Sequence, residues 1–252
     1  MKLNYKHRWD VTPKKAIEIQ NILSKNITLE KFKGNLRFVA GVDASYRNGI
    51  CRAYICILKY PELTLVKWVS ASSCIKFPYI PGLLTFREGP TILKCIEKIN
   101  HRIDVFLFDG QGIAHPRRMG IASHIGLLIN KPTIGCAKGL LYGKYIKFPD
   151  KEKGSYTYIM DKEEKIGIVL RTRPNTKPVF VSPGYKIDLH NSLKTILGCA
   201  KKYRIPEPLR IAHHLSLVNY QTGRHKICVQ QSLDGRRKKS LPIPAGVDRI
   251  DY

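Results

Sequence analysis

Two aspartates stand where apolar segments end, a placement that suits chemistry at the edge of a sheet. Asp43 closes the apolar part of residues 39–46 (VAGVDASY), and Asp109 does the same in residues 105–112 (VFLFDGQG). Carboxylates at the ends of neighbouring strands converge, and they must then share protons or bind a cation. A hard divalent metal suits such oxygen ligands. The alternative is that each aspartate only begins a turn, as Asp often does.

Glu88 and His213 could add to such a site. Glu88 precedes Gly89 and Pro90 at the expected start of a helix, where a carboxylate also favours the positive end of the helix dipole. His213 falls at the edge of the apolar stripe of a predicted helix. Each residue could also be purely structural: Glu88 as a helix cap, and His213 as a histidine at the edge of the core. Beside a metal, His213 could instead orient or deprotonate a water.

A short loop combines two prolines with an aromatic side chain, a pattern that could serve in binding a nucleic acid. Residues 78–82 (PYIPG) place an aromatic side chain between two prolines, which stiffen the backbone. A stiff loop with an aromatic tip can enter a base stack and hold a nucleotide out of it. The same residues could also form an ordinary tight turn.

The surrounding pattern predicts one α/β domain. An amphipathic helix is expected in the N-terminal arm, residues 1–35, with Thr12 as cap and Pro13 in the first turn. Three strands joined by short turns then predict an antiparallel meander, and alternating strands and helices predict parallel sheet. The strands are expected at residues 36–44, 51–59, 63–70, 104–108, 133–137, 156–160, 166–170 and 179–182, and the helices at 89–99, 120–129, 191–203 and 207–218. This order is that of an RNase H-like fold with a central mixed sheet flanked by helices.

Charge and cysteine content narrow the class of protein. The chain of 252 residues carries 44 Lys and Arg against 19 Asp and Glu, a formal net charge of +25. Such an excess predicts a polyanionic partner, most simply nucleic acid, although a lysine-rich proteome would also raise it. The seven cysteines form no CxxC pair, so free thiols in a reducing cytoplasm are expected. Neither a membrane span nor a secretory signal is expected from the hydrophobic pattern.

Taken together, these segments resemble the Endonuclease V family of inosine-directed nucleases. The resemblance is carried by residues 39–46, 78–90 (PYIPGLLTFREGP), 105–126 (VFLFDGQGIAHPRRMGIASHIG), 133–140 (TIGCAKGL) and 206–213 (PEPLRIAH). One departure is Tyr185, which stands where the family pattern more often has a histidine.

The resemblance implies a role for each matching residue. Asp43, Glu88 and Asp109 would hold Mg²⁺, with Mn²⁺ able to substitute, while Lys138 would lie beside the scissile phosphate and His213 would position the attacking water. The wedge would consist of Pro78, Tyr79, Ile80 and Pro81, and the hypoxanthine pocket of Gly82, Leu84, Gly110, His115, Gly120 and Ile121. Arg117 and Arg118 are expected to contact the nucleic-acid backbone.

The activity implied is hydrolysis of the second phosphodiester bond 3′ to inosine in DNA, as a step of repair. An inosine-specific endoribonuclease and a non-catalytic nucleic-acid-binding module are the alternatives. A monomer is expected, with a catalytic domain over residues 1–222 and a basic tail over residues 223–252 that contains Arg236, Arg237, Lys238 and Lys239.

Overall fold

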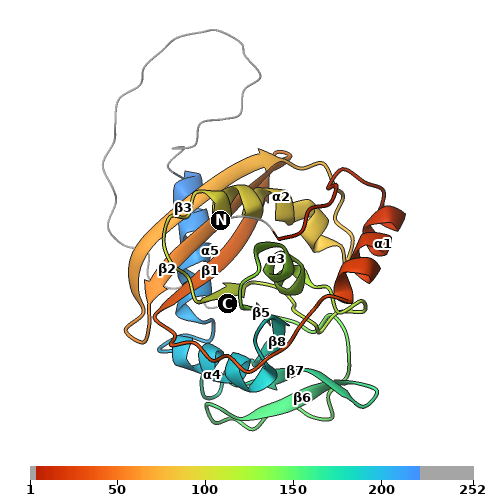
Figure 1. Cartoon of the computed structure of the whole chain (residues 1–252). Coiled ribbons are helices and arrows are strands. Elements are labelled where there is room, and N and C mark those ends of the chain that lie inside the picture. Colours follow the sequence, from red (N-terminus) through yellow and green to blue (C-terminus); the bar gives the residue numbers. More distant parts are fainter. Residues whose placement is uncertain (1–3, 222–252) are drawn as a thin grey trace, which may run out of the picture.

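The computed structural model describes residues 4–221, so the basic tail expected from the sequence lies outside the described residues. Strands form one sheet in the order β3-β2-β1-β4-β5-β8-β7-β6 (Figure 1). The strands are β1 (Phe38–Arg47), β2 (Ile50–Lys59), β3 (Thr64–Cys74), β4 (Val105–Phe108), β5 (Thr133–Ala137), β6 (Tyr156–Asp161), β7 (Glu164–Leu170) and β8 (Val179–Tyr185). The helices are α1 (Pro13–Ser24), α2 (Leu84–Glu97), α3 (Ile121–Ile129), α4 (Leu189–Cys199) and α5 (Glu207–Gln221).

The strand directions confirm the RNase H-like fold. Strands β1, β2 and β3 pair antiparallel as a meander, whereas β4 runs parallel to both β1 and β5. Beyond β5, the strands β8, β7 and β6 return to antiparallel pairing and extend the sheet.

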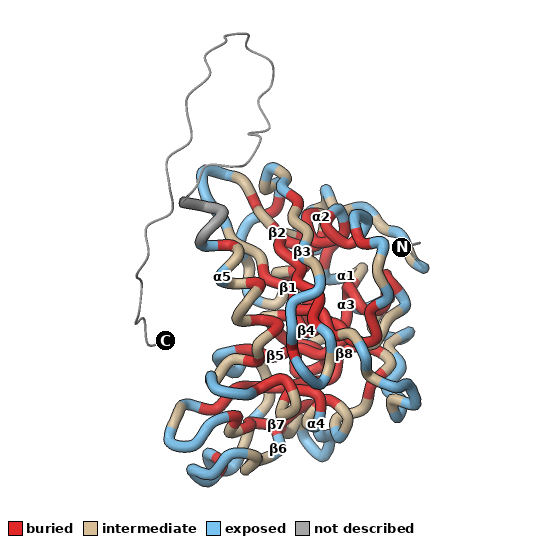
Figure 2. Tube along the Cα trace, turned by 90° about the vertical axis from the view of Figure 1, so that its left-hand side faces the viewer, coloured by how far each residue is buried: buried red, intermediate tan, exposed pale blue. Residues whose placement is uncertain are grey.

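Helices cover both faces of the sheet, and the alternation of side chains along the central strands decides which residue faces which layer. In β4, Phe106 and Phe108 pack with α2 and α3, while Val105 and Leu107 pack with α4 and α5. Buried residues therefore run through the middle of the molecule, with exposed ones at the turns (Figure 2). Parallel strands buried on both faces are apolar throughout, as β4 is.

The N-terminal helix is shorter than the arm in which it was expected. α1 begins at Pro13, and its Thr12 cap accepts a hydrogen bond from the Lys15 amide, as the sequence predicts. It ends at Ser24, and the following chain instead packs Phe32 and Leu36 against the cluster below α4 and α5. The partial burial of these two side chains against the core favours this non-helical path over a longer helix.

Helix α2 begins earlier than expected, at Leu84 instead of residue 89. Glu88 is therefore inside the helix, and Pro90 is an interior residue although proline normally disfavours that position. Buried side chains lie on both sides of the proline, including Phe86 and Ile92. Their packing against the sheet offsets the missing hydrogen bond, so tertiary contacts override local propensity here.

The described cysteines are free thiols, all buried except Cys74. Tyr185, the departure from the family pattern, is buried in a small cluster with Met119 and Leu127. No helix in residues 4–221 has both the length and the apolar character needed to cross a bilayer.

The start of α5 lies directly on β1, and this contact places His213 above the sheet. A Cβ added to Gly41 would lie 2.1 Å from the Pro208 carbonyl oxygen. Gly41→Ala should therefore lower the free energy of unfolding by about 1–3 kcal/mol, the usual cost of overpacking. Urea denaturation would measure it. Gly139→Ala is the matched control because nothing lies within 4 Å of its added Cβ; equal effects of the two variants would contradict the tight contact.

Candidate active site

Asp43 and Asp109 lie side by side at the end of one parallel strand pair. Pairing between β1 and β4 stops at Val42 and Phe108, where the Asp109 amide still donates to the Val42 carbonyl at 3.3 Å. The expectation that Asp43 ends its strand is wrong in one respect. β1 continues to Arg47 because its antiparallel pairing with β2 continues to that residue. Only the parallel pairing of β1 with β4 ends next to Asp43.

Glu88 joins the two aspartates from α2. It is buried, and its Oε1 accepts a hydrogen bond from the hydroxyl of Tyr46 on β1. Burial raises the pKa of Glu88 to about 8, and the nearby Asp43 and Asp109 carboxylates add to the rise. Negative charge is therefore concentrated where β1, β4 and α2 meet.

Two basic side chains contact the aspartates. Lys138 follows β5, and its Nζ donates to Asp109 Oδ2 at 2.9 Å, which raises the pKa of the lysine despite its partial burial. His213 Nδ1 lies 3.3 Å from Asp43 Oδ2, and this hydrogen bond raises the pKa of the imidazole. All five residues expected to be catalytic are thus brought together, from β1, α2, α5 and the ends of β4 and β5.

The donors present fit a hard divalent cation in their chemistry. Asp43, Glu88 and Asp109 offer oxygen atoms only; burial is the main cause of the raised pKa of Glu88, and the two neighbouring aspartates, whose charge a cation would offset, contribute to it. In the side-chain positions seen in residues 4–221, no three His, Cys, Asp or Glu side chains already form a metal-binding group. Instead, Asp109 forms a salt bridge with Lys138, and Asp43 contacts the imidazole of His213.

A pocket of about 190 Å³ lies beside the carboxylates. This is smaller than the roughly 300–1,000 Å³ of sites for drug-sized ligands, and suits a single base. Its lining includes every residue expected to surround hypoxanthine, namely Gly82, Leu84, Gly110, His115, Gly120 and Ile121. Tyr79, Ile80 and Pro81 also line it, whereas Pro78 does not contribute. The sequence did not single out Thr85, Gln111, Met119, Ala137 and Leu141, which complete the wall.

The pocket and the acidic site share three segments of chain. Gly110 directly follows Asp109, Ala137 directly precedes Lys138, and Leu84 lies one helical turn before Glu88. The position of the pocket relative to the carboxylates is therefore fixed by the fold. Close backbone approach shapes the wall, since a Cβ added at Gly120 would lie 2.3 Å from the Gln111 carbonyl oxygen.

His115 is a neutral structural part of this wall. Its Nε2 lies 2.9 Å from the Gly82 carbonyl oxygen and therefore carries the proton, while its Nδ1 accepts from the Arg117 amide at 3.1 Å. Burial lowers the pKa of His115 to about 4, and the charges of Arg117 and Arg118 lower it further. With both nitrogens engaged, His115 supplies the pocket with its ring surface.

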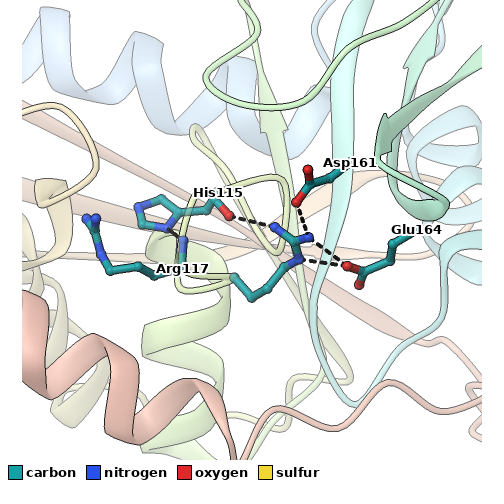
Figure 3. A network of polar contacts seen from close by, with 5 residues as sticks. His115, Arg117, Asp161 and Glu164 are labelled. Atoms are coloured by element: carbon teal, nitrogen blue, oxygen red, sulfur yellow. Dashed lines mark hydrogen bonds and ion pairs between the residues drawn. The ribbon is translucent and has the colours of Figure 1, made fainter.

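Arg117 and Arg118 are held by groups of the protein itself (Figure 3). Arg118, which has φ +56°, donates to Asp161 at 2.5 Å and Glu164 at 2.6 Å, and so ties the pocket loop to the β6–β7 hairpin. Arg117 contacts Gln20 and the Gly82 carbonyl. Contact of either arginine with a nucleic-acid backbone stays a prediction.

Two residues that the sequence did not suggest also contact the site: Tyr46 donates a hydrogen bond to Glu88, and Gln20 donates one to the Gly82 carbonyl oxygen in the pocket lining. Tyr46 lies three residues after Asp43 in β1, beyond the point where the strand was expected to end. Gln20 looks like any polar residue of an amphipathic helix, yet it is buried against the pocket. No local pattern signals either contact, because each depends on a segment distant in the sequence.

An RNase H-like sheet that carries clustered carboxylates beside a base-sized pocket defines a nuclease. The Endonuclease V family model matches residues 21–214. The Endonuclease V of Methanothrix thermoacetophila is 49% identical over 211 residues, which cover 84% of this chain and 93% of that protein. The chain belongs to the Endonuclease V family, and it is an endonuclease of a metal-dependent family that binds nucleic acid.

Solved structures of Endonuclease V proteins share the fold of this chain. The Endonuclease V of Bacillus subtilis superimposes with a TM-score of 0.81 at 32% identity, covering 89% of this chain and all of that one. The Ciona intestinalis Endonuclease V, solved in complex with a 24mer DNA containing an inosine followed by a ribo-adenosine, gives a TM-score of 0.73 at 29% identity. That comparison covers 82% of this chain and 97% of the Ciona chain.

The raised pKa of Glu88 has a measurable effect on stability. Between its ordinary value of 4.5 and about 8, folded Glu88 keeps a proton that the unfolded chain releases. Stability contributed by this group therefore falls as pH rises through that window. In EDTA, Glu88→Gln should be more stable than the parent by about 5 kcal/mol at pH 9, and the difference should shrink toward zero near pH 4.5.

Urea denaturation across this pH range would measure the difference. Glu97→Gln is the control, because Glu97 is exposed at the end of the same helix. A difference between Glu88→Gln and the parent that does not change with pH would contradict the raised pKa.

Proposed function

We propose that this endonuclease recognises inosine in DNA during repair and hydrolyses the second phosphodiester bond 3′ to it, with Mg²⁺ or Mn²⁺ as cofactor. The products would be a 3′-hydroxyl and a 5′-phosphate. The carrying observation is the base-sized pocket whose walls continue directly into the segments of Asp109, Glu88 and Lys138. The inosine-containing DNA held by the Ciona relative supports this substrate.

The carboxylates would provide the metal site. Asp43, Glu88 and Asp109 are the residues that would hold the cation, and their oxygen atoms suit Mg²⁺. When bound, a divalent cation polarises a phosphate and lowers the pKa of a coordinated water. Tyr46 holds Glu88 through its hydroxyl, and β1 holds Tyr46 and Asp43 on one strand.

The basic residues would serve the reacting phosphate and water. His213, held against Asp43, orients the attacking water and can accept its proton. Lys138 is half-exposed beside Asp109, so its ammonium group can turn to a phosphate oxygen and offset the charge that develops there.

Recognition of the base would depend on the backbone of the pocket. Hypoxanthine offers O6 as an acceptor and N1–H as a donor, and adenine reverses both. A wall that donates to O6 and accepts from N1–H leaves unpaired polar groups against adenine, which allows discrimination of about 10⁴-fold. Gly110 and Gly120 let peptide groups approach the base without an intervening side chain.

The loop with Tyr79 would hold the duplex open. Tyr79 is 68% exposed at the rim of the pocket, between Pro78 and Pro81. Its ring can fill the space left in the stack by a flipped nucleotide. An inosine pair also opens more easily than a Watson–Crick pair, which favours the damaged site.

The remaining expectations complete the proposal. We place the catalytic unit in residues 1–222, regard residues 223–252 as a basic extension, and propose a cytoplasmic monomer. Inosine-containing RNA is the competing substrate, since contacts to 2′-hydroxyl groups would decide between them. Matched DNA and RNA oligonucleotides with one inosine, incubated with Mg²⁺ and with Mn²⁺, test the choice; faster nicking of RNA would favour the ribonuclease.

Loss of an aspartate should abolish hydrolysis. Asp43→Ala and Asp109→Ala should each reduce nicking of inosine-containing DNA by at least about 10³-fold, because these residues act as one unit. Binding of the DNA, measured by fluorescence anisotropy, should persist. Asp10→Ala, at an aspartate 80% exposed and remote in sequence from the site, should leave nicking unchanged. Full activity of either active-site variant would refute the assignment.

Loss of the aromatic wedge should matter most where bases are stacked. Tyr79→Ala should slow nicking of duplex DNA by about tenfold and of single-stranded DNA by less than about threefold, since only the duplex must be held open. Tyr156→Ala, which removes an exposed tyrosine of β6, is the control. Equal losses on both substrates would show that Tyr79 does not act as a wedge.

A further inference from the structure

We propose that Gln20 of α1 is a positioning residue that fixes two segments of the base-pocket lining, at Gly82 and at Met119, relative to each other. This inference rests on the proposed recognition of a flipped base. The family model begins its match at residue 21, so Gln20 lies just outside the matched segment. The residue is 1% exposed, which is unusual for glutamine on a surface helix.

The amide of Gln20 contacts two segments of the pocket lining. Its Nε2 donates to the Gly82 carbonyl oxygen at 3.0 Å and to the Met119 carbonyl oxygen at 3.1 Å. Gly82 ends the loop that carries Tyr79, and Met119 directly precedes Gly120. One side-chain amide therefore links two backbone segments that are 37 residues apart in the sequence and that both line the pocket.

The Gly82 carbonyl oxygen is the shared acceptor of this network. Besides Gln20, it accepts from His115 Nε2 at 2.9 Å and from Arg117 Nη2 at 3.0 Å. Arg117 in turn donates through Nε to Gln20 Oε1 at 2.6 Å, so both polar atoms of the amide are engaged. Figure 3 shows His115 and Arg117 lying close together; both donate to the Gly82 carbonyl oxygen.

The backbone of Gly82 makes this fixation necessary. Its φ of +80° is readily available only to glycine, and glycine also has the most freedom to leave it. Without the Gln20 donor, only His115 and Arg117, both from the segment that leads to Gly120, would hold this carbonyl, and α1 would no longer anchor either segment. A base bound through peptide groups depends on their orientation, because small misplacements at a site cost up to about 100-fold in rate.

Helix α1 is well placed to supply a rigid donor. Ala16 and Leu23 of the same helix are buried, and they hold the helix against two neighbouring clusters. Gln20 lies between them on the buried face. The helix thus acts on the pocket through one side chain, while the metal-binding carboxylates contact none of its residues in the hydrogen bonds described.

The proposal predicts loss of base selectivity with retention of chemistry. Gln20→Met keeps the length and apolar volume of the side chain but removes every hydrogen bond. It should raise KM for inosine-containing DNA by about tenfold or more and should lower the preference for inosine over adenine by a similar factor. The kcat at saturating DNA with Mg²⁺ should stay within about threefold of the parent.

Gln20→Glu separates hydrogen bonding from shape. The carboxylate can still accept from Arg117, but it cannot donate to Gly82 and Met119 and places negative charge against their carbonyl oxygens. The KM and selectivity defects should therefore be at least as large as in Gln20→Met. Asn21→Met is the matched control, because Asn21 is the exposed neighbour on α1 and loses the same chemical group.

Nicking kinetics on single-stranded oligonucleotides with one inosine or one adenine, together with thermal melting of each variant, test the proposal. A rise in KM and a fall in selectivity for both Gln20 variants, with melting like that of Asn21→Met, support it. Unchanged KM and selectivity, or a fall in kcat alone in parallel with melting temperature, would overturn it. If the parent fails to nick inosine-containing DNA, the proposed function itself has failed.

Discussion

Burial of a carboxyl group between two aspartates is the constraint on which this structure depends. Glu88 is almost fully buried, which raises its pKa, and the nearby Asp43 and Asp109 carboxylates contribute to the rise. Three sets of contacts hold the group in place: parallel pairing of β1 with β4, packing of α2 across the sheet, and direct contacts from Lys138 and His213. The chain as a whole carries a net charge of +25, opposite in sign to this acidic centre.

In the proposed function, the same segments would serve recognition and chemistry. Each of Asp109, Glu88 and Lys138 is followed or preceded within a turn of chain by residues that line the pocket. A base in that pocket would lie at a position fixed relative to the carboxylates. Such a shared framework would allow cleavage at a set number of bonds from a modified base without a separate measuring element.

Much of this arrangement could be predicted from the sequence, and the failures have identifiable causes. The order of strands and helices, the Thr12 cap and the strand at Thr133–Ala137 follow from local pattern. The start of α2 and the extent of β1 were wrong because burial of Phe86 and pairing with β2 override local signals. Residues such as Gln20 and Tyr46 could not be found, since their partners are brought near only by the fold. Segments with a specific motif predicted residues that the fold brings together at the carboxylates and around the pocket, whereas Gln20 in α1 and Tyr46 in β1 carried no local signal.

Arg118 gives the pocket a connection to the far edge of the sheet. Its two carboxylate partners, Asp161 and Glu164, flank the turn between β6 and β7. The backbone of Arg118 belongs to the loop that also supplies His115 and Gly120 to the pocket lining. The ion pairs of Arg118 therefore hold the β6–β7 hairpin and this part of the pocket in a fixed relative position. Replacing Asp161 or Glu164 would therefore loosen the segment that carries Arg118 from the far edge of the sheet, without altering any residue that lines the pocket.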